Sequence, residues 1–356
     1  MIKLLIVDDS ALMRRQLMNL FQAAGDFDIR QARNGEEAVR ENRDFQPDVV
    51  TLDINMPEMD GLTALSLIMT ERPVAVVMVS SLTNEGALAT FEALNLGAMD
   101  YVAKPGGTIS LSIDRITEEL VAKVRAAARC RPRGRPSGAA TVARRMQEER
   151  KKAAASSAMA APRGVGDGLL VVGASTGGPR ALEIVLSGLP ASFPWPVLVA
   201  QHMPAAFTRA FAERLNQCCA LQVVEANSTL PIEAGKIYIG RGGADMVLAS
   251  RAGRLTVLPM PENPQHLWHP SVELLGRSVL EHYDPKRVTA VLLTGMGYDG
   301  SDAFAEIKKR GGRTIAESEE SAVVYGMPAE LVAKGGATLV LAVERVASQL
   351  SIWAGR

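Results

Sequence analysis

Short apolar runs that alternate with segments of helical periodicity constrain the fold of this chain most strongly. Runs of roughly 4–8 residues with almost no polar side chains are typical of parallel strands buried on both faces. After the first run, residues Ala11–Ala24 place apolar side chains at helical spacing. This alternation predicts a doubly wound α/β domain with a parallel sheet. The N-terminal runs are Leu4–Val7, Val49–Leu52, Val74–Val79 and Tyr101–Ala103.

The same alternation begins again at Leu169, after a stretch of different composition. Residues 127–166 are rich in Arg, Pro and Ala and hold few large apolar residues, so we expect an exposed linker, partly helical at Ala143–Ala155. The predicted organisation is a first domain at 1–125, a flexible linker at 126–166 and a second α/β domain at 167–356. Its predicted strands are Leu169–Val172, Val197–Ala200, Lys236–Ile239 and Val288–Leu293, and its predicted helices are Pro179–Leu189, Thr208–Leu215, Ser271–Tyr283, Ser301–Arg310 and Val343–Trp353.

Length and composition limit the class of protein. A chain of 356 residues, 47% hydrophobic and 22% charged, is long enough for two globular domains. Its formal net charge is zero, so no overall field attracts nucleic acid or an anionic membrane. Its three cysteines, two of them adjacent, are a poor disulfide framework, and no Cys/His cluster has zinc spacing. Because it has neither a signal-peptide core nor a membrane-length apolar run, we expect a cytoplasmic protein without membrane insertion.

Polar residues follow the predicted strands of the first domain in an ordered set. The first strand ends at Asp8 and Asp9, the third at Asp53, the fourth at Ser80 and the fifth at Lys104. Ligands bind at this edge of doubly wound sheets. Carboxylates so close together repel one another unless a hard cation joins them, which implies Mg²⁺, and a carboxylate beside Mg²⁺ can form an aspartyl phosphate. Each motif alone is more often a solvated turn, but the set on successive strands outweighs that interpretation.

These motifs resemble the response-regulator receiver family over the first domain. The resemblance implies a flavodoxin-like fold that is phosphorylated on an aspartate in the presence of Mg²⁺. The matching segments are Val7-Asp8-Asp9-Ser10, Leu52–Gly61, Val79-Ser80-Ser81 and Tyr101-Val102-Ala103-Lys104-Pro105. The implied residues are Asp53 as phospho-acceptor, Asp8, Asp9, Asp53 and the backbone carbonyl of Asn55 as Mg²⁺ ligands, Ser80 and Lys104 as phosphoryl contacts, and Tyr101 as the side chain that changes rotamer on activation. Some relatives carry Glu where Asn55 stands, which matters little if the ligand is a backbone carbonyl.

A second site is indicated by residues Gly173–Pro179, which follow an apolar strand and open a helix. This is the context in which a strand-to-helix turn exposes a nucleophilic serine, here Ser175, although such a turn can also bind phosphate or be merely structural. Of the four histidines only His202 directly follows an apolar strand, and Asp299 lies in the loop after another. These three residues are expected on one rim of the second sheet. Their order along the chain differs from that of the α/β-hydrolases, but triads are defined by geometry.

The remaining histidines are weaker candidates for a catalytic base. His282 lies at the end of a predicted helix, where we expect it at the surface. His266 and His269 lie in a Pro-rich loop and could line the cleft.

The motifs of the second domain resemble the chemotaxis protein-glutamate methylesterase/glutamine deamidase (CheB) family. With the receiver in front, the resemblance covers nearly the whole chain except the linker and implies a Rossmann-like catalytic domain. The matching segments are Gly173–Pro179, Gln201-His202-Met203, His269-Pro270-Ser271-Val272-Glu273 and Gly295–Gly300. The implied roles are Ser175 as nucleophile, His202 as general base and then acid, Asp299 as its orienting carboxylate, the Met296 backbone N–H as oxyanion donor, and Thr176 as a residue that positions the histidine.

The resemblance also implies a reaction and partners. The reaction is hydrolysis of glutamate methyl esters on methyl-accepting chemotaxis receptors, with release of methanol, and deamidation of specific receptor glutamines. No cofactor is expected for the esterase chemistry, and Mg²⁺ serves only the receiver. A CheA-type histidine kinase is the implied phosphodonor, and recruitment to chemoreceptor arrays is expected.

Two alternatives remain at this point. The output domain could be a different serine hydrolase, which would share the triad but not the substrate. It could instead be a phosphorylation-switched DNA-binding module that uses the basic linker, but the sequence has no helix-turn-helix signature and the triad residues would then be unexplained. We therefore expect no nucleic-acid partner.

Overall fold

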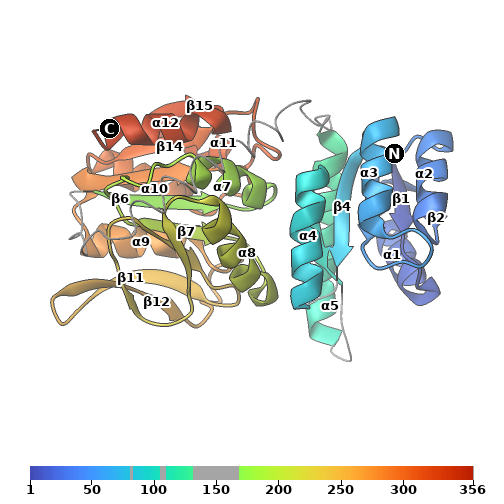
Figure 1. Ribbon diagram of the computed structural model, residues 1–356, viewed down its shortest axis with the longest axis horizontal. Coiled ribbons are helices and arrows are strands. Elements are labelled where there is room, and N and C mark those ends of the chain that lie inside the picture. Colours follow the sequence, from blue (N-terminus) through green and yellow to red (C-terminus); the bar gives the residue numbers. More distant parts are fainter. Residues whose placement is uncertain (81–82, 105–109, 131–167, 356) are drawn as a thin grey trace. The chain divides into compact units, whose positions relative to one another are not determined.

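The protein forms two compact units, Met1–Gly138 and Ala139–Arg356, and each is described by itself. The computed structural model describes residues 1–80, 83–104, 110–130 and 168–355 (Figure 1). Most of the expected linker, including the predicted helix at Ala143–Ala155, lies outside these residues. The last helix of the first unit runs through Arg129, so residues 126–129 are helical.

The first unit is a five-stranded parallel sheet with helices between its strands, as predicted. The strand order is β2-β1-β3-β4-β5, so the chain reverses direction across the sheet between β1 and β3. The segments that follow these two strands therefore start next to each other. Its elements are β1 (Ile2–Val7), α1 (Ala11–Ala24), β2 (Phe27–Ala32), α2 (Gly35–Asp44), β3 (Val49–Asp53), α3 (Gly61–Glu71), β4 (Ala75–Ser80), α4 (Asn84–Leu96), β5 (Asp100–Ala103) and α5 (Ser110–Arg129).

Strand β2 was not predicted as an apolar run. It pairs only with β1, at the edge of the sheet, and only Phe27 and Ala32 at its two ends are buried. An edge strand needs no continuous apolar run, so the criterion that finds buried strands misses it.

The second unit is built on a seven-stranded parallel sheet of order β15-β14-β13-β6-β7-β10-β8. The predicted strands and helices are present, with ends shifted by up to three residues. The strands of this sheet are β6 (Leu169–Ala174), β7 (Val197–Gln201), β8 (Gln222–Ala226), β10 (Lys236–Gly240), β13 (Val288–Leu292), β14 (Arg313–Glu317) and β15 (Leu339–Leu341). The helices are α7 (Gly178–Ser187), α8 (Ala205–Cys218), α9 (Val272–His282), the 3₁₀ turn η1 (Pro285–Arg287), α10 (Ser301–Lys309), α11 (Met327–Ala333) and α12 (Val343–Trp353).

A small antiparallel sheet, which was not predicted, covers helix α9. It consists of β9 (Leu230–Pro231), β11 (Asp245–Arg251) and β12 (Arg254–Met260), in the order β11-β12-β9. Strand β11 packs against α9, and Figure 1 shows the β11–β12 hairpin beneath that helix. The backbone N–H of Leu248 donates to Ser278 Oγ at 2.9 Å. This sheet thus holds α9 from the side opposite the large sheet.

The start of α9 lies unusually close to strand β6. A Cβ on Gly173 would be 2.4 Å from Val272 Cγ1, so only glycine allows the first turn of α9 to approach the strand this closely. Ser271 is the N-cap of the helix, and its hydroxyl accepts from the Leu274 N–H at 3.3 Å. The helix N-terminus is therefore brought to the carboxyl edge of the central strands. Among the described helices, none is long and apolar enough to cross a membrane.

Candidate functional site

Three neighbouring strands carry the candidate triad at their carboxyl ends. Ser175 follows β6, His202 follows β7, and Asp299 lies in the loop after β13. The chain continues from β6 to one side of the sheet and from β13 to the other, so the edge between these two strands is a switch point where ligands bind. The expectation that the three residues share one rim of a parallel sheet is confirmed.

The turn that carries Ser175 is fixed to the segment after β13. The Ser175 N–H donates to the Thr294 carbonyl at 3.0 Å, and Thr294 Oγ1 donates to the Thr176 carbonyl at 2.9 Å. On the other side, Gln201 Nε2 donates to the Ser175 carbonyl at 2.9 Å. The turn is therefore tied to both neighbouring strands, and its position does not depend on a bound ligand.

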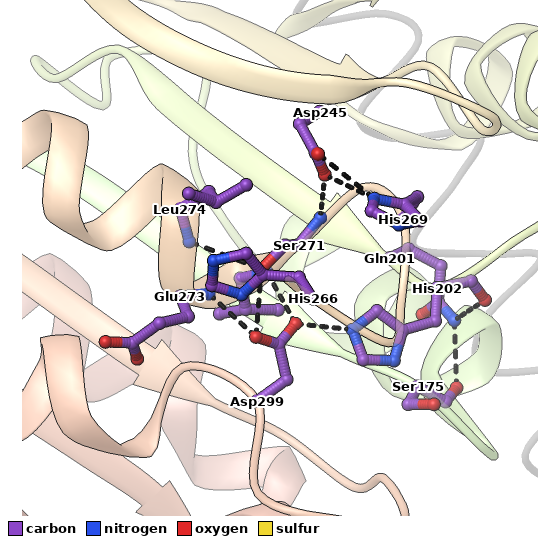
Figure 2. A network of polar contacts seen from close by, with 11 residues as sticks. Ser175, Gln201, His202, Asp245, His266, His269, Ser271, Glu273, Leu274 and Asp299 are labelled. Atoms are coloured by element: carbon purple, nitrogen blue, oxygen red, sulfur yellow. Dashed lines mark hydrogen bonds and ion pairs between the residues drawn. The ribbon is translucent and has the colours of Figure 1, made fainter. Parts of the chain in front are cut away.

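The imidazole of His202 is held by the carboxylate of Asp299. His202 Nε2 lies 2.8 Å from Asp299 Oδ2, and both side chains are almost fully buried. Because a carboxylate can only accept, the single proton of the neutral imidazole lies on Nε2 and Nδ1 keeps a lone pair. His202 Nδ1 is buried and has no hydrogen-bond partner among the described residues, and Figure 2 shows it on the side of the ring that faces Ser175. A basic nitrogen that faces a hydroxyl group can accept its proton.

Asp299 is bound by the N-terminus of α9 as well as by His202. Its Oδ1 accepts from Ser271 Oγ at 3.0 Å and from the Glu273 N–H at 3.0 Å, and its Oδ2 accepts from the Val272 N–H at 2.7 Å (Figure 2). Burial raises the pKa of this carboxyl, but His202 and the two N–H groups outweigh burial and lower the pKa below its usual value. Asp299 therefore stays ionised and favours the tautomer described above.

The two other residues implied at this site are present but make no contact that assigns a role. The Met296 N–H donates to no backbone carbonyl within the described part of the chain, and this residue lies next to the segment that holds Ser175. Thr176 is buried, and its Oγ1 likewise has no partner among the described residues. The roles of both residues stay predictions.

The acidic residues of the first unit gather at the carboxyl ends of β1 and β3. Lys104 Nζ lies 2.8 Å from Asp8 Oδ2 and 2.7 Å from Asp53 Oδ2. Burial and the neighbouring Asp8 raise the pKa of Asp53, and Lys104 opposes this only in part. Burial lowers the pKa of Lys104, but the two carboxylates outweigh it and raise the pKa above its usual value.

This acidic cluster fits a hard divalent cation. One carboxylate oxygen from each of Asp8, Asp9 and Asp53 lies within 4.8 Å of the others, and Asp9 is exposed to solvent. Oxygen ligands of this kind are those that Mg²⁺ prefers, together with water. Asn55 is exposed in the segment after β3, and its role as a backbone ligand stays a prediction.

Ser80 and Tyr101 lie on the two strands beyond Asp53. Ser80 ends β4 and is buried, with its Oγ 3.3 Å from the Gly86 carbonyl. Tyr101 is buried in β5, with Lys123 Nζ 5.4 Å from its ring centroid. Residues 81–82 and 105–109, which complete two of the matching motifs, lie outside the described residues.

Comparison with known proteins identifies the family of each domain. Residues 170–350 match the CheB methylesterase family, and residues 4–113 match the response regulator receiver domain. A Rhodospirillum rubrum protein named protein-glutamate methylesterase/protein-glutamine glutaminase 3 is 54% identical over 359 residues, which cover 100% of this chain and 97% of the relative. The chain belongs to the CheB methylesterase family.

Two further CheB relatives support this conclusion. A Rhodopseudomonas palustris protein named protein-glutamate methylesterase/protein-glutamine glutaminase 2 is 52% identical over 362 residues, covering 99% of this chain and 98% of the relative. The crystal structure of the Thermotoga maritima CheB methylesterase catalytic domain is 34% identical, with a TM-score of 0.50, and covers 52% of this chain and 98% of that domain.

Residues around the candidate triad extend the polar network beyond the predicted set. His269 Nδ1 lies 2.9 Å from Asp245 Oδ1, which also accepts from the Ser271 N–H at 2.8 Å. His266 Nδ1 lies 3.5 Å from Ser271 Oγ. The two loop histidines thus lie beside the start of α9 (Figure 2). Sequence reasoning missed Asp245 because it opens an unpredicted strand, and it missed Ser271, although a serine at a helix start signals an N-cap.

Ser271 links this outer network to the triad, and its removal tests the link. We expect Ser271→Ala to reduce hydrolysis of a glutamate methyl ester roughly 10-fold or more, because a hydrogen bond to a charged group contributes ~1.5–3 kcal/mol. Ser271→Thr keeps the hydroxyl and should retain most of the activity. Steady-state methanol release measures both.

A matched control separates the capping role of Ser271 from its bond to Asp299. Ser10 caps α1 in the same way, with its Oγ accepting from the Met13 N–H at 3.3 Å. Ser10→Ala loses a comparable cap and should leave hydrolysis without phosphodonor unchanged. If Ser271→Ala were as active as Ser10→Ala, the Ser271 hydroxyl would have no part in holding Asp299.

Proposed function

We propose that this member of the CheB methylesterase family hydrolyses glutamate methyl esters on methyl-accepting chemotaxis receptors and deamidates specific receptor glutamines. Ser175 is the nucleophile, His202 the base and acid, and Asp299 the carboxylate that orients His202. The observation that carries this proposal is the His202–Asp299 pair, which leaves the unprotonated Nδ1 on the side of Ser175 (Figure 2). A serine hydrolase triad has the same succession of carboxylate, imidazole and hydroxyl, although here Nε2 rather than Nδ1 contacts the carboxylate.

The reaction proceeds in two halves. Ser175 Oγ attacks the carbonyl carbon of the ester while His202 Nδ1 takes the hydroxyl proton. Methoxide then leaves with this proton from His202 as methanol, and the glutamyl group stays on Ser175 as an ester. Next, His202 takes a proton from a water molecule that attacks the acyl-enzyme, and returns it to Ser175 Oγ as the carbon–oxygen bond to Ser175 breaks. The glutamyl carboxylic acid that is released loses its remaining proton to solvent. A glutamine amide follows the same route, with ammonia as the leaving group.

Two features of the fold stabilise the charges that form. The imidazolium forms beside Asp299, whose lowered pKa keeps it ionised throughout the reaction. The Met296 N–H is our proposed donor to the oxyanion, because it has no backbone acceptor in the described part of the chain and lies beside the Ser175 turn. Thr176 is proposed to help position His202.

Phosphorylation of Asp53 is proposed to control this activity. Asp8, Asp9, Asp53 and the Asn55 carbonyl would hold Mg²⁺, which would offset the negative charge at the phosphoryl group. The contact of Lys104 with Asp53 supports a pairing of Lys104 with a phosphoryl oxygen, and Ser80, which ends the adjacent strand, would contact the same group. Tyr101 is proposed to change rotamer when the group is added.

The partners follow from the same proposal. The substrates are chemoreceptors, and the phosphodonor is a CheA-type histidine kinase. The enzyme would act in the cytoplasm and be recruited to chemoreceptor arrays. A serine hydrolase with another substrate is the competing possibility, and a comparison of methylated receptor with generic esters distinguishes the two.

Replacement of Ser175 tests the chemistry. Ser175→Ala should reduce methanol release from radiolabelled methylated receptor by on the order of 10⁴-fold, because only the nucleophilic oxygen is lost. Ser348→Ala, an exposed serine of α12, is the matched control and should match the wild type. Near wild-type release by Ser175→Ala, with an unchanged circular dichroism spectrum, would rule out Ser175 as the nucleophile.

Replacement of Asp53 tests the control. Wild-type activity should rise ~10-fold or more when a small-molecule phosphodonor and Mg²⁺ are added, and Asp53→Asn should lose this rise. Asp28→Asn, which changes an exposed aspartate on the edge strand β2, should keep it. Activation that survives in Asp53→Asn would move the phospho-acceptor to another residue.

A further inference from the structure

A tryptophan is stacked against the proposed catalytic histidine. The indole of Trp268 is stacked on the imidazole of His202, with ring centroids 5.5 Å apart and the planes inclined by only 4°. Trp268 lies in the loop between β12 and α9, whereas His202 follows β7. Two segments far apart in the sequence therefore meet through these rings.

The loop that carries Asp299 is shaped to accommodate this indole. Tyr298 packs edge-on against Trp268, with centroids 5.4 Å apart and planes at 82°. Gly297 has a φ of +86°, and a Cβ there would lie 2.7 Å from Trp268 Cη2. A side chain at this position would displace the indole, so the glycine provides the space that the stack needs. Trp268 thus contacts the segments of two triad residues at once.

Stacking restricts a rotation of the imidazole ring that its hydrogen bond to Asp299 still allows. The bond fixes Nε2, but the ring could still tilt about the Nε2–Asp299 direction and turn Nδ1 away from Ser175. An indole parallel to the ring opposes this tilt, because the aromatic contact is lost when the planes diverge. The indole face also carries negative potential, which attracts a protonated imidazole.

We propose that Trp268 is a positioning residue of this esterase: it holds the plane of His202 so that Nδ1 faces Ser175, and it stabilises the imidazolium formed in each half-reaction. The inference rests on the proposed role of His202 as base and acid. It assigns a function to a side chain that belongs to none of the predicted site residues.

The contact between Trp268 and His202 can be tested separately from the other contacts around these two residues. Asp299 is the charged group in direct contact with the imidazole. His266 and His269 flank Trp268 in sequence, but their Nδ1 atoms face Ser271 and Asp245 respectively. The other two tryptophans are elsewhere: Trp195 packs on Phe193, and Trp353 lies against Arg313.

Fluorescence tests the stack without any turnover. A full-length Trp195→Phe/Trp353→Phe protein emits from Trp268 alone. A protonated imidazole quenches an indole by accepting an electron from its excited state, and a neutral imidazole does so weakly. The Trp268 emission should therefore fall as pH decreases, with the same midpoint as the acid limb of the pH–rate profile of ester hydrolysis. The fall should vanish in His202→Gln and persist in His266→Gln and His269→Gln.

Kinetics test the positioning role. Trp268→Ala should lower kcat roughly 10-fold with little change in KM, because the lost interaction acts on the base rather than on the substrate. Trp268→Phe keeps an aromatic face and should recover most of that loss. Trp195→Phe is the matched control and should have wild-type kcat.

The outcomes separate this inference from the proposed function. Emission that is flat with pH, or a quench that survives in His202→Gln, would overturn the stack. Wild-type kcat in a folded Trp268→Ala would overturn the positioning role, while loss of activity in His202→Gln would leave the proposed function standing. An active His202→Gln would contradict the proposed function itself, whatever Trp268 does.

Discussion

The binding of the Asp299 carboxylate by the N-terminus of α9 is the interaction on which the candidate catalytic site depends. It accepts from two backbone N–H groups of the first helical turn, from the Ser271 hydroxyl and from His202. These donors keep the carboxylate ionised despite its burial, and its charge sets the tautomer of His202. The close approach of β6 to α9 at Gly173, and the antiparallel sheet that backs α9, are what bring the helix to this point.

Both domains have a polar site at the same position in the sheet, but the pKa of the central aspartate is shifted in opposite directions. Each places acidic residues where the strand order reverses, between β1 and β3 in the receiver and between β13 and β6 in the catalytic domain. In the receiver, burial and Asp8 raise the pKa of Asp53, and one lysine compensates in part. In the catalytic domain, neutral donors and a histidine lower the pKa of Asp299. The first arrangement suits a group that gains a phosphoryl group and a cation, and the second suits a fixed counter-charge.

Much of this could be predicted from the sequence because buried parallel strands are continuous apolar runs. The residues that follow such runs can be placed on the carboxyl edge of their own sheet without knowing the strand order. Asp53 is an example in the first domain, and Ser175 and His202 are examples in the second. The order itself, and hence the adjacency of β13, β6 and β7, required the structure. Strand β2, in which only the two end residues are buried, has no continuous apolar run and was not predicted.

The residues missed around the triad share one cause. Their contacts join segments that are distant in sequence, and a periodic pattern in the sequence does not predict such contacts. These residues are Asp245, Ser271 and Trp268. The local sequence identifies Ser271 as a helix cap, and the structure agrees. Its hydrogen bond to Asp299, however, depends on the position of the loop after β13. Trp268 reads as an ordinary aromatic residue in a Pro-rich loop. Its neighbour across the ring stack is known only once the chain is folded.

The central claim is that Ser175 is activated through His202 by an ionised Asp299. The most direct measurement is the rate at which an organophosphonate fluoride labels the protein, with the modified residue located by peptide mass spectrometry, in the wild type and in Asp299→Asn. The account predicts that the label lies on Ser175 and forms on the order of 10³- to 10⁴-fold more slowly in Asp299→Asn. Equal labelling rates in the two proteins, or a label on another residue, would contradict it.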